Sequence, residues 1–173
     1  TIEVESELGK GTAFIFRIPF KIDQNIHQQD EMEPQEHPQE RMLRGMKILL
    51  AEDNEINAEI LTELLKIEGA ECTICENGEE ILKAFEQSAP GDYDMILMDV
   101  QMPVMDGLEA TRRIRNGENP LGRVIPILAM TANAFLEDMQ KSKEAGMDAH
   151  LSKPVDIAAL EQTVKRFRVT SPH

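Results

Sequence analysis

The sequence predicts an α/β protein with a five-stranded parallel sheet and an additional β-hairpin near the N-terminus. From residue 46 onward, short apolar runs alternate with segments whose apolar residues recur at helical spacing. This pattern is typical of buried parallel strands joined by crossover helices. Residues 1–20 instead alternate apolar and polar residues with a period of two, as an antiparallel hairpin does. At 173 residues and 41% hydrophobic content, the chain can bury the core of such a sheet.

The N-terminal part divides into a hairpin and a linker. Residues 1–7 and 13–20 are the expected strands, and residues 8–12 form the turn. Residues 21–45 hold five glutamines, six acidic residues and two prolines but few apolar side chains. Such a segment buries too little surface to offset the entropy of ordering it, so we expect a solvated linker.

Five helices are expected among the strands of the C-terminal part. Their order, each following a strand, predicts a parallel sheet covered on both faces. A loop with two glycines and a proline is expected to be exposed at residues 116–123. The helices are expected from Ile56 to just before Gly69, and over residues 78–88, 108–115, 134–145 and 157–167.

Four of the predicted strands end in polar side chains. Because the carboxyl ends of parallel strands lie at one edge of a sheet, these side chains are expected to form one site. The site contains three carboxylates, a hydroxyl and an ammonium group: Glu52 and Asp53 after residues 47–51, Asp99 after residues 94–98, Thr131 after residues 125–130 and Lys153 after residues 149–152.

The chemistry of this set is restricted. Three carboxylates and one lysine are costly to bring together unless a cation joins them. Oxygen ligands in small number suit Mg²⁺, while the lack of His or Cys at these strand ends argues against zinc. A carboxylate beside Mg²⁺ can attack a phosphoryl group, and the hydroxyl of Thr131 and the ammonium of Lys153 can then hold the phosphoryl oxygens.

Residues 46–168 resemble the receiver domain of bacterial two-component response regulators. Glu52-Asp53 is similar to the acidic pair of that family, and Asp99, in the segment Met98 to Gly107, to its phospho-acceptor. Thr131-Ala132 and Lys153-Pro154 are similar to its switch threonine and to its lysine before a cis proline. The resemblance implies a flavodoxin-like (βα)5 receiver fold with strand order 2-1-3-4-5 and Mg²⁺ as cofactor.

The resemblance also assigns roles to individual residues. Asp99 is the expected phosphorylation site, and Asp99, Thr131 and Lys153 are the expected catalytic set. Asp53, Asp99 and the backbone carbonyl of Gln101 are the expected Mg²⁺ ligands. Glu52 is expected to act on the metal through water; its alternative is to compensate charge at a helix N-terminus.

The switch residues are expected to be Thr131 and His150. Receivers usually have Tyr or Phe three residues before the lysine, where this chain has His150. An imidazole can also swing inward, but it is smaller and titrates near neutrality. The alternative is an exposed histidine with no switching role.

The hairpin resembles the last hairpin of the ATP-binding domain of histidine kinases, whose Gly-Thr-x-Phe stretch occurs at residues 11–14. An unrelated β-extension is the alternative. The order of hairpin, linker and receiver suggests the C-terminal fragment of a hybrid histidine kinase, with residues 169–173 as a tail. Such a fragment lacks the kinase catalytic core, so we expect it to bind no ATP and to catalyse only its own phosphorylation and dephosphorylation.

The function expected from these observations is that of a phosphorelay module. It would accept a phosphoryl group from the phosphohistidine of a kinase dimerisation domain and pass it to a histidine phosphotransfer protein. The alternative is a receiver that regulates its attached kinase by docking, without onward transfer. A Mg²⁺-dependent phosphatase is disfavoured, because the acid it needs two residues after the nucleophile is here Gln101. The apolar hairpin, with its open edge, also allows a homodimer.

The composition restricts the partners, the compartment and the state of the cysteines. A formal net charge of −14 disfavours binding to nucleic acid or to anionic membranes. No stretch of 18 apolar residues is present, so we expect a cytoplasmic fragment, whose parent protein could be anchored in the inner membrane. Cys72 and Cys75 form a C-x-x-C pattern on a predicted strand, where residues three apart point to opposite faces, so we expect two reduced thiols.

Overall fold

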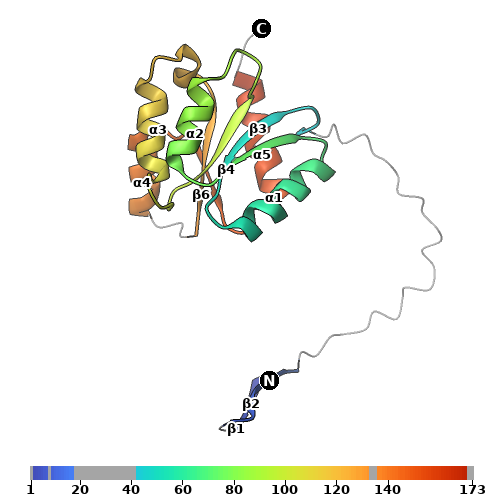
Figure 1. The fold of residues 1–173 in the computed structure, drawn as a ribbon. Helices are drawn as coiled ribbons and strands as arrows, with labels where there is room; N and C mark the ends of the chain where they lie inside the picture. Colours follow the sequence, from blue (N-terminus) through green and yellow to red (C-terminus); the bar gives the residue numbers. More distant parts are fainter. Residues whose placement is uncertain (1, 8, 18–41, 133–135, 171–173) are drawn as a thin grey trace, which may run out of the picture. The chain divides into compact units, whose positions relative to one another are not determined.

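The computed structural model describes residues 2–7, 9–17, 42–132 and 136–170 and divides the chain into two compact units, residues 1–37 and 38–173 (Figure 1). The elements are β1 (Ile2–Glu7), β2 (Gly11–Phe16), β3 (Lys47–Ala51), α1 (Glu55–Ile67), β4 (Glu71–Cys75), α2 (Gly78–Glu86), β5 (Met95–Asp99), α3 (Gly107–Asn116), the 3₁₀ helix η2 (Pro120–Arg123), β6 (Ile127–Thr131), α4 (Leu136–Ala145), β7 (Ala149–Ser152) and α5 (Ile157–Thr170).

The first unit is the predicted hairpin. β1 and β2 pair antiparallel, with Ile2 opposite Phe16 and Val4 opposite Phe14. Residues two apart on a strand share a face, so these four apolar side chains lie on one side, and all four are exposed. The predicted continuation of this apolar side, at Ile18 and Phe20, lies outside the described residues.

The second unit is a five-stranded parallel sheet of order β4-β3-β5-β6-β7. Counted from the first parallel strand this is 2-1-3-4-5, so the predicted fold class and strand order are confirmed. Helices α1 and α5 cover one face of the sheet, and α2, α3 and α4 cover the other (Figure 1). Alternate residues of β3 enter the two resulting cores: Ile48 and Leu50 face α1 and α5, and Leu49 faces α2 and α3.

Polar side chains start the helices that surround the site. The Asn54 side chain accepts a hydrogen bond from the backbone N–H of Asn57 at the start of α1, and Asp106 accepts one from Glu109 at the start of α3. These bonds satisfy backbone donors that have no partner inside the helix. Each helix therefore begins at a defined residue: α1 starts close after the end of β3, and α3 starts at Gly107, after the loop that follows Asp99.

Several boundaries differ from the sequence prediction. Leu43, assigned to the solvated linker, is fully buried in the core with α1 and α5, so ordered packing begins before residue 46. Helix α5 extends to Thr170, into the predicted tail. The loop that was expected to be exposed, at residues 116–123, contains η2 and the buried Gly122.

The two cysteines lie on opposite faces of β4, as predicted. Cys72 packs against the core under α1 and α5, and Cys75 belongs to the core under α2 and α3. Both are free thiols. Burial, followed by the charge of Glu80, raises the pKa of Cys75 to about 11, which keeps it protonated at neutral pH. Among the described residues, no helix combines the length and the apolar character needed to cross a membrane.

Candidate functional site

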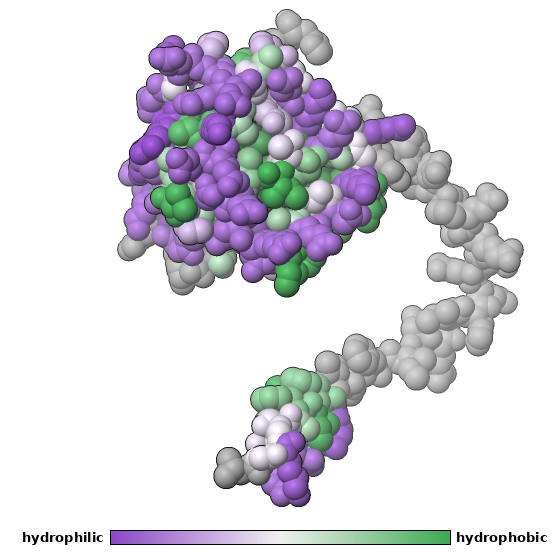
Figure 2. Space-filling view, in the orientation of Figure 1, coloured by the Kyte–Doolittle hydropathy of each residue, from purple (hydrophilic) through white to green (hydrophobic). Residues whose placement is uncertain are grey.

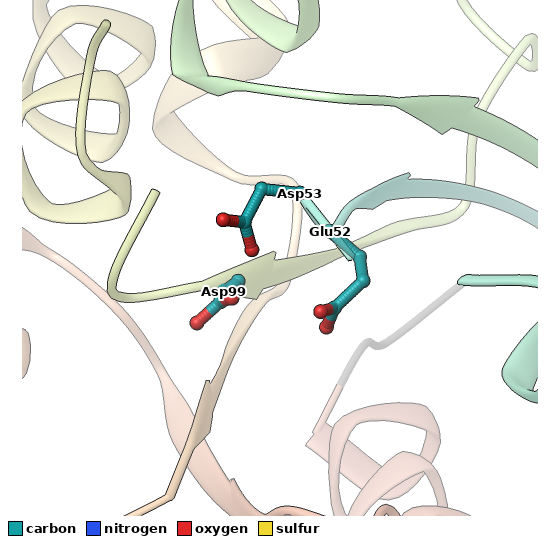
Figure 3. A group of neighbouring side chains, drawn as sticks. All are labelled: Glu52, Asp53 and Asp99. Atoms are coloured by element: carbon teal, nitrogen blue, oxygen red, sulfur yellow. The ribbon is translucent and has the colours of Figure 1, made fainter. Parts of the chain in front are cut away.

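Three carboxylates meet at the carboxyl edge of the sheet. Asp99 is the last residue of β5, and Glu52 and Asp53 directly follow the neighbouring strand β3. One carboxylate oxygen of each lies within 4.8 Å of those of the other two (Figure 3). Glu52 and Asp99 are only 3% and 5% exposed, whereas Asp53 is exposed. The cluster therefore has two buried acids and one acid open to solvent.

Lys153 joins this cluster from the end of β7. Its Nζ atom lies 2.6 Å from Oδ2 of Asp99 and 2.5 Å from Oε2 of Glu52. Its backbone N–H donates to the carbonyl of Thr131 at 2.9 Å, which holds the ends of β6 and β7 together, and the Lys153–Pro154 bond is cis. Burial alone would lower the pKa of Lys153, but the two carboxylates raise it by more, so the ammonium form is retained.

Asp99 has a hydrogen-bond donor for each carboxylate oxygen. Lys153 donates to Oδ2, and the backbone N–H of Gln101 donates to Oδ1 at 3.0 Å. Burial raises the pKa of Asp99 above its usual range, and these two donors oppose that rise. The side chain is therefore held in one orientation at the end of β5.

Glu52 is oriented by a residue that the sequence analysis did not identify. Nδ2 of Asn57, in the first turn of α1, donates to Oε1 of Glu52 at 3.2 Å. Lys153 contacts the other oxygen, so both oxygens of this buried carboxylate have partners. A polar side chain in the first turn of the helix after the acidic pair is the sequence signal that could have found it.

Gly107 allows α3 to begin against the end of β5. A Cβ atom at this position would lie 2.0 Å from the backbone oxygen of Asp99, a distance that no side chain can adopt. The N–H of Gly107 donates to the carbonyl of Val100 at 3.1 Å, which closes the loop that follows Asp99. Gly107, the last residue of the Met98 to Gly107 segment, therefore allows this loop and the start of α3 to lie close to Asp99.

The residues present fit a magnesium ion. Ligands of Mg²⁺ lie about 2.0–2.1 Å from the ion, so opposite ligands are about 4 Å apart, and a small adjustment of the three carboxylates meets this requirement. Three carboxylates and one lysine have a formal charge of −2, which a divalent cation balances. Gln101 contacts Asp99 through its N–H, and its carbonyl as a metal ligand stays a prediction.

The two predicted switch residues lie on β6 and β7. Thr131 is the last residue of β6 and pairs with Ser152 of β7. It directly follows Met130, which pairs with Asp99 of β5. His150 is half-buried rather than exposed, and its Nε2 atom is buried without a hydrogen-bond partner. Burial lowers the pKa of His150. The neutral imidazole is therefore favoured, and its role as a switch stays a prediction.

Known proteins similar to this chain include large signalling kinases. Hybrid signal transduction histidine kinase L of Dictyostelium discoideum is 35% identical over 150 residues, which cover 86% of this chain and 9% of that protein. Sensor histidine kinase RcsC of Salmonella typhi is 40% identical over 119 residues, 69% of this chain and 12% of that protein. The chain thus spans only a small part of the length of these curated relatives.

Solved structures that share the fold include two receiver domains. The receiver domain of sensor histidine kinase PA1611 from Pseudomonas aeruginosa PAO1, with magnesium coordinated in its active site cleft, has a TM-score of 0.65 and 39% identity, covering 73% of this chain and 99% of that one. A receiver domain from the Saccharomyces cerevisiae complex of Ypd1 with Ssk1 has a TM-score of 0.63 and 30% identity, covering 72% and 89%. Residues 48–165 match the response regulator receiver domain. The chain therefore belongs to the response regulator receiver domain family.

Proposed function

We propose that this chain is the phosphoacceptor module of a phosphorelay. Asp99 receives a phosphoryl group from a phosphohistidine on the dimerisation and phosphotransfer domain of a histidine kinase, and it passes the group on to a histidine phosphotransfer protein. The observation that carries the proposal is the position of Asp99, which lies between two other carboxylates and the ammonium group of Lys153 at one sheet edge.

The transfer follows from the surroundings of Asp99. A carboxylate oxygen of Asp99 attacks phosphorus in line with the phosphorus–nitrogen bond of the phosphohistidine; the new oxygen–phosphorus bond forms as that bond breaks, and its electron pair returns to the imidazole. Lys153, 2.6 Å from Asp99, follows the negative charge onto the phosphoryl oxygens. When bound, Mg²⁺ supplies positive charge that offsets the repulsion between the phosphoryl group and the acids.

Asp53 and Glu52 have different parts in holding the ion. Asp53 is exposed and can bind the ion directly, with Asp99 and the carbonyl of Gln101 as the further ligands. Glu52 already accepts hydrogen bonds from Lys153 and Asn57 at its two oxygens, which favours contact with the ion through water. The hydroxyl of Thr131 donates to a phosphoryl oxygen once Asp99 is modified.

The similar proteins support both the cofactor and the partners. A magnesium ion is coordinated in the active site cleft of the PA1611 receiver domain. The Ssk1 receiver domain was solved together with the histidine phosphotransfer protein Ypd1. The curated relatives are hybrid or sensor histidine kinases, which supports a hybrid kinase as the parent protein and the kinase ATP-binding domain as the origin of the hairpin.

Onward transfer separates a relay from a receiver that only regulates its own kinase. We expect the chain, phosphorylated on Asp99, to lose its label within seconds to a purified histidine phosphotransfer protein from the same organism. A variant of that protein with its histidine replaced by glutamine is the control and should leave the label in place. A label that decays at the same rate with both proteins would contradict the relay and favour regulation by docking alone.

A further inference from the structure

The loop that connects Asp99 to helix α3, residues 100–106, contains a strained turn. The N–H of Met105 donates to the carbonyl of Pro103 at 2.7 Å, and Val104 between them has φ 66°. A three-residue turn with a positive φ at its centre is the rare and strained form of the γ-turn, and a β-branched residue adds to the cost. The loop beside Asp99 therefore has a conformation that its own sequence disfavours.

The exposure of this turn does not explain its conformation. Val104 is 80% exposed, but apolar side chains also lie in several small groups on the largely hydrophilic face seen in Figure 2, which is ordinary for a protein surface. A strained backbone persists only where the surrounding structure holds it, and such strain is concentrated at functional sites. Contacts from another part of the chain should therefore hold this loop.

Gly78, the first residue of α2, supplies such a contact. Its N–H donates to the carbonyl of Met105 at 3.0 Å, directly after the strained turn. A Cβ atom at Gly78 would lie 2.5 Å from that carbonyl oxygen and 3.0 Å from Cγ of Met105. Gly78 does not have a positive φ, so its backbone conformation is open to other residues. The glycine is therefore required by the space that Met105 occupies.

The start of α2 is held by its own hydrogen bonds. The side chain of Asn77 accepts from the N–H groups of Glu79 and Glu80, both at 3.0 Å. The carboxylate of Glu80 in turn accepts from the N–H of Glu76 at 2.9 Å and from the Asn77 amide at 3.2 Å. Reciprocal bonds of this kind fix the first turn of a helix. Gly78 therefore meets the loop from a fixed position.

The loop connects this contact with the site. Gln101 donates its N–H to Oδ1 of Asp99 at 3.0 Å, and its carbonyl is the expected further ligand of Mg²⁺. The N–H of Gly107 donates to the carbonyl of Val100 at 3.1 Å, which closes the loop at its far end. A short loop that is closed at its ends and held at Met105 has little freedom between these points. A displacement of Met105 should therefore move Gln101.

We propose that Gly78 is a positioning residue for phosphoryl transfer: through the carbonyl of Met105 it holds the strained loop, so that Gln101 stays against Asp99. The inference rests on the proposed function, because it assigns Gly78 a part in the reaction of that site. A misplacement of about 1 Å can slow a reaction about 100-fold, and contacts behind the ligands of a metal can change its affinity about 10- to 100-fold. A shift of this loop is thus large enough to measure.

A second buried glycine provides the matched control. A Cβ atom at Gly122, at the amino edge of the sheet, would lie 2.1 Å from the carbonyl oxygen of Ile114. Gly122→Ala should therefore destabilise the fold and leave Mg²⁺ affinity and labelling by acetyl phosphate unchanged. Gly78→Ala should weaken Mg²⁺ binding at least about fivefold and slow labelling at least about tenfold. Unchanged values in Gly78→Ala, or equal losses in both variants, would overturn the proposal.

A milder pair of variants decides the matter if the added methyl group prevents folding. Asn77→Ala removes the cap of α2, and Asn119→Ala removes the cap of η2, where Asn119 accepts from the N–H of Leu121 at 3.1 Å. Asn77→Ala loosens the start of α2, so it should weaken Mg²⁺ binding about two- to threefold, whereas Asn119→Ala should not. The parent affinity in a folded Asn77→Ala chain would then refute the role of Gly78.

NMR of the metal-free chain keeps this inference separate from the proposed function. In the full ¹⁵N-labelled chain, Gly78→Ala should shift the amides of Met105 and of Gln101, whereas Gly122→Ala should leave the Gln101 amide in place. Shifts that stop at Met105 would show that the contact does not reach the site and would overturn the proposal. A parent chain that acetyl phosphate cannot label would instead contradict the proposed function, while the Gln101 shift and the Mg²⁺ affinity still decide whether Gly78 positions the loop.

Discussion

The two edges of the parallel sheet use buried charge in opposite ways. At the amino edge, Arg115 donates to the carbonyls of Gly146, Gly122 and Ile125 at 2.7–2.8 Å and to Oδ2 of Asp148 at 2.7 Å. Its charge and its donors are matched by acceptors. At the carboxyl edge, three carboxylates face a single lysine, which leaves acceptors and negative charge in excess.

The difference separates stability from reactivity within one sheet. The amino-edge network connects the end of α3 with the segments that precede β6 and β7, and its balance makes it a structural clamp. The unbalanced carboxyl edge is suited to take up a cation and a phosphoryl group. Substitutions at the amino edge should therefore change the free energy of unfolding, and those at the carboxyl edge should change binding and transfer.

The largest expected effect is loss of the clamp. Arg115→Met should lower the free energy of unfolding by about 3 kcal/mol, because it leaves three half-buried carbonyls without a donor. Arg113→Met is the control: its guanidinium is exposed and, among the described residues, pairs only with Glu109, so the cost should stay below about 1 kcal/mol. Urea unfolding measures both, and equal effects in the two variants would contradict a clamp at the amino edge.

Loss of a metal ligand comes next. Asp53→Ala should weaken Mg²⁺ binding about 10- to 100-fold, since a small site of oxygen ligands has little redundancy. Because Asp53 is exposed, the free energy of unfolding without metal should change little. Calorimetric titration with Mg²⁺ gives the affinity, and Glu118→Ala provides an exposed acid away from the site as the control. An unaltered affinity in Asp53→Ala would refute its assignment as a ligand.

These effects bear on how much could be predicted from the sequence. The five parallel strands, their order, and the meeting of Glu52, Asp53, Asp99 and Lys153 were predictable, because apolar runs mark buried strands and parallel strands end at one edge. Arg115 was not, because its partners are mainly backbone carbonyls up to 31 residues away, which leave no pattern in the sequence.

Packing explains the other misses. Leu43 is a single apolar residue within a polar stretch, and its burial depends on the core formed by α1 and α5. Gly122 belongs to a segment whose composition predicts an exposed loop, but it packs against the end of α3. A Cβ atom at Gly122 would lie 2.1 Å from the carbonyl oxygen of Ile114. Local composition marks Leu43 as part of a polar stretch and Gly122 as part of a turn, and it contains no information on what either residue contacts.

A smaller effect concerns backbone strain at the reactive edge. Val104, in the loop after Asp99, has φ 66° and is 80% exposed. A β-branched residue is unfavourable in this left-handed region, which asparagine tolerates, so Val104→Asn should stabilise the fold by about 1 kcal/mol. Val124→Asn, at φ −123° and also exposed, should give no such gain. A thermal unfolding series distinguishes them, and equal shifts would argue against strain at Val104.

The smallest expected effect is the pH dependence due to His150. Its folded pKa lies below 6.5, so the unfolded chain binds more protons there, and stability that is fully present above pH 6.5 falls as the pH drops toward the folded pKa. The loss should be below about 1 kcal/mol and absent from His150→Phe. Urea unfolding of both chains at pH 7.5 and 5.5 checks this. The same change in the free energy of unfolding between the two pH values in both chains would show that burial does not affect this imidazole.

Phosphorylation with acetyl phosphate is the most direct measurement of the central claim. With Mg²⁺ present, the chain should gain one phosphoryl group by intact mass spectrometry, and chelation of the metal should prevent it. Asp94→Asn changes an acid at the amino edge, where it accepts from the Lys47 N–H, and should leave labelling intact. Asp99→Asn should incorporate nothing, because among the described residues no other carboxylate accepts hydrogen bonds from both Lys153 and the Gln101 N–H. Stoichiometric labelling of Asp99→Asn would contradict the account and move the acceptor to another residue.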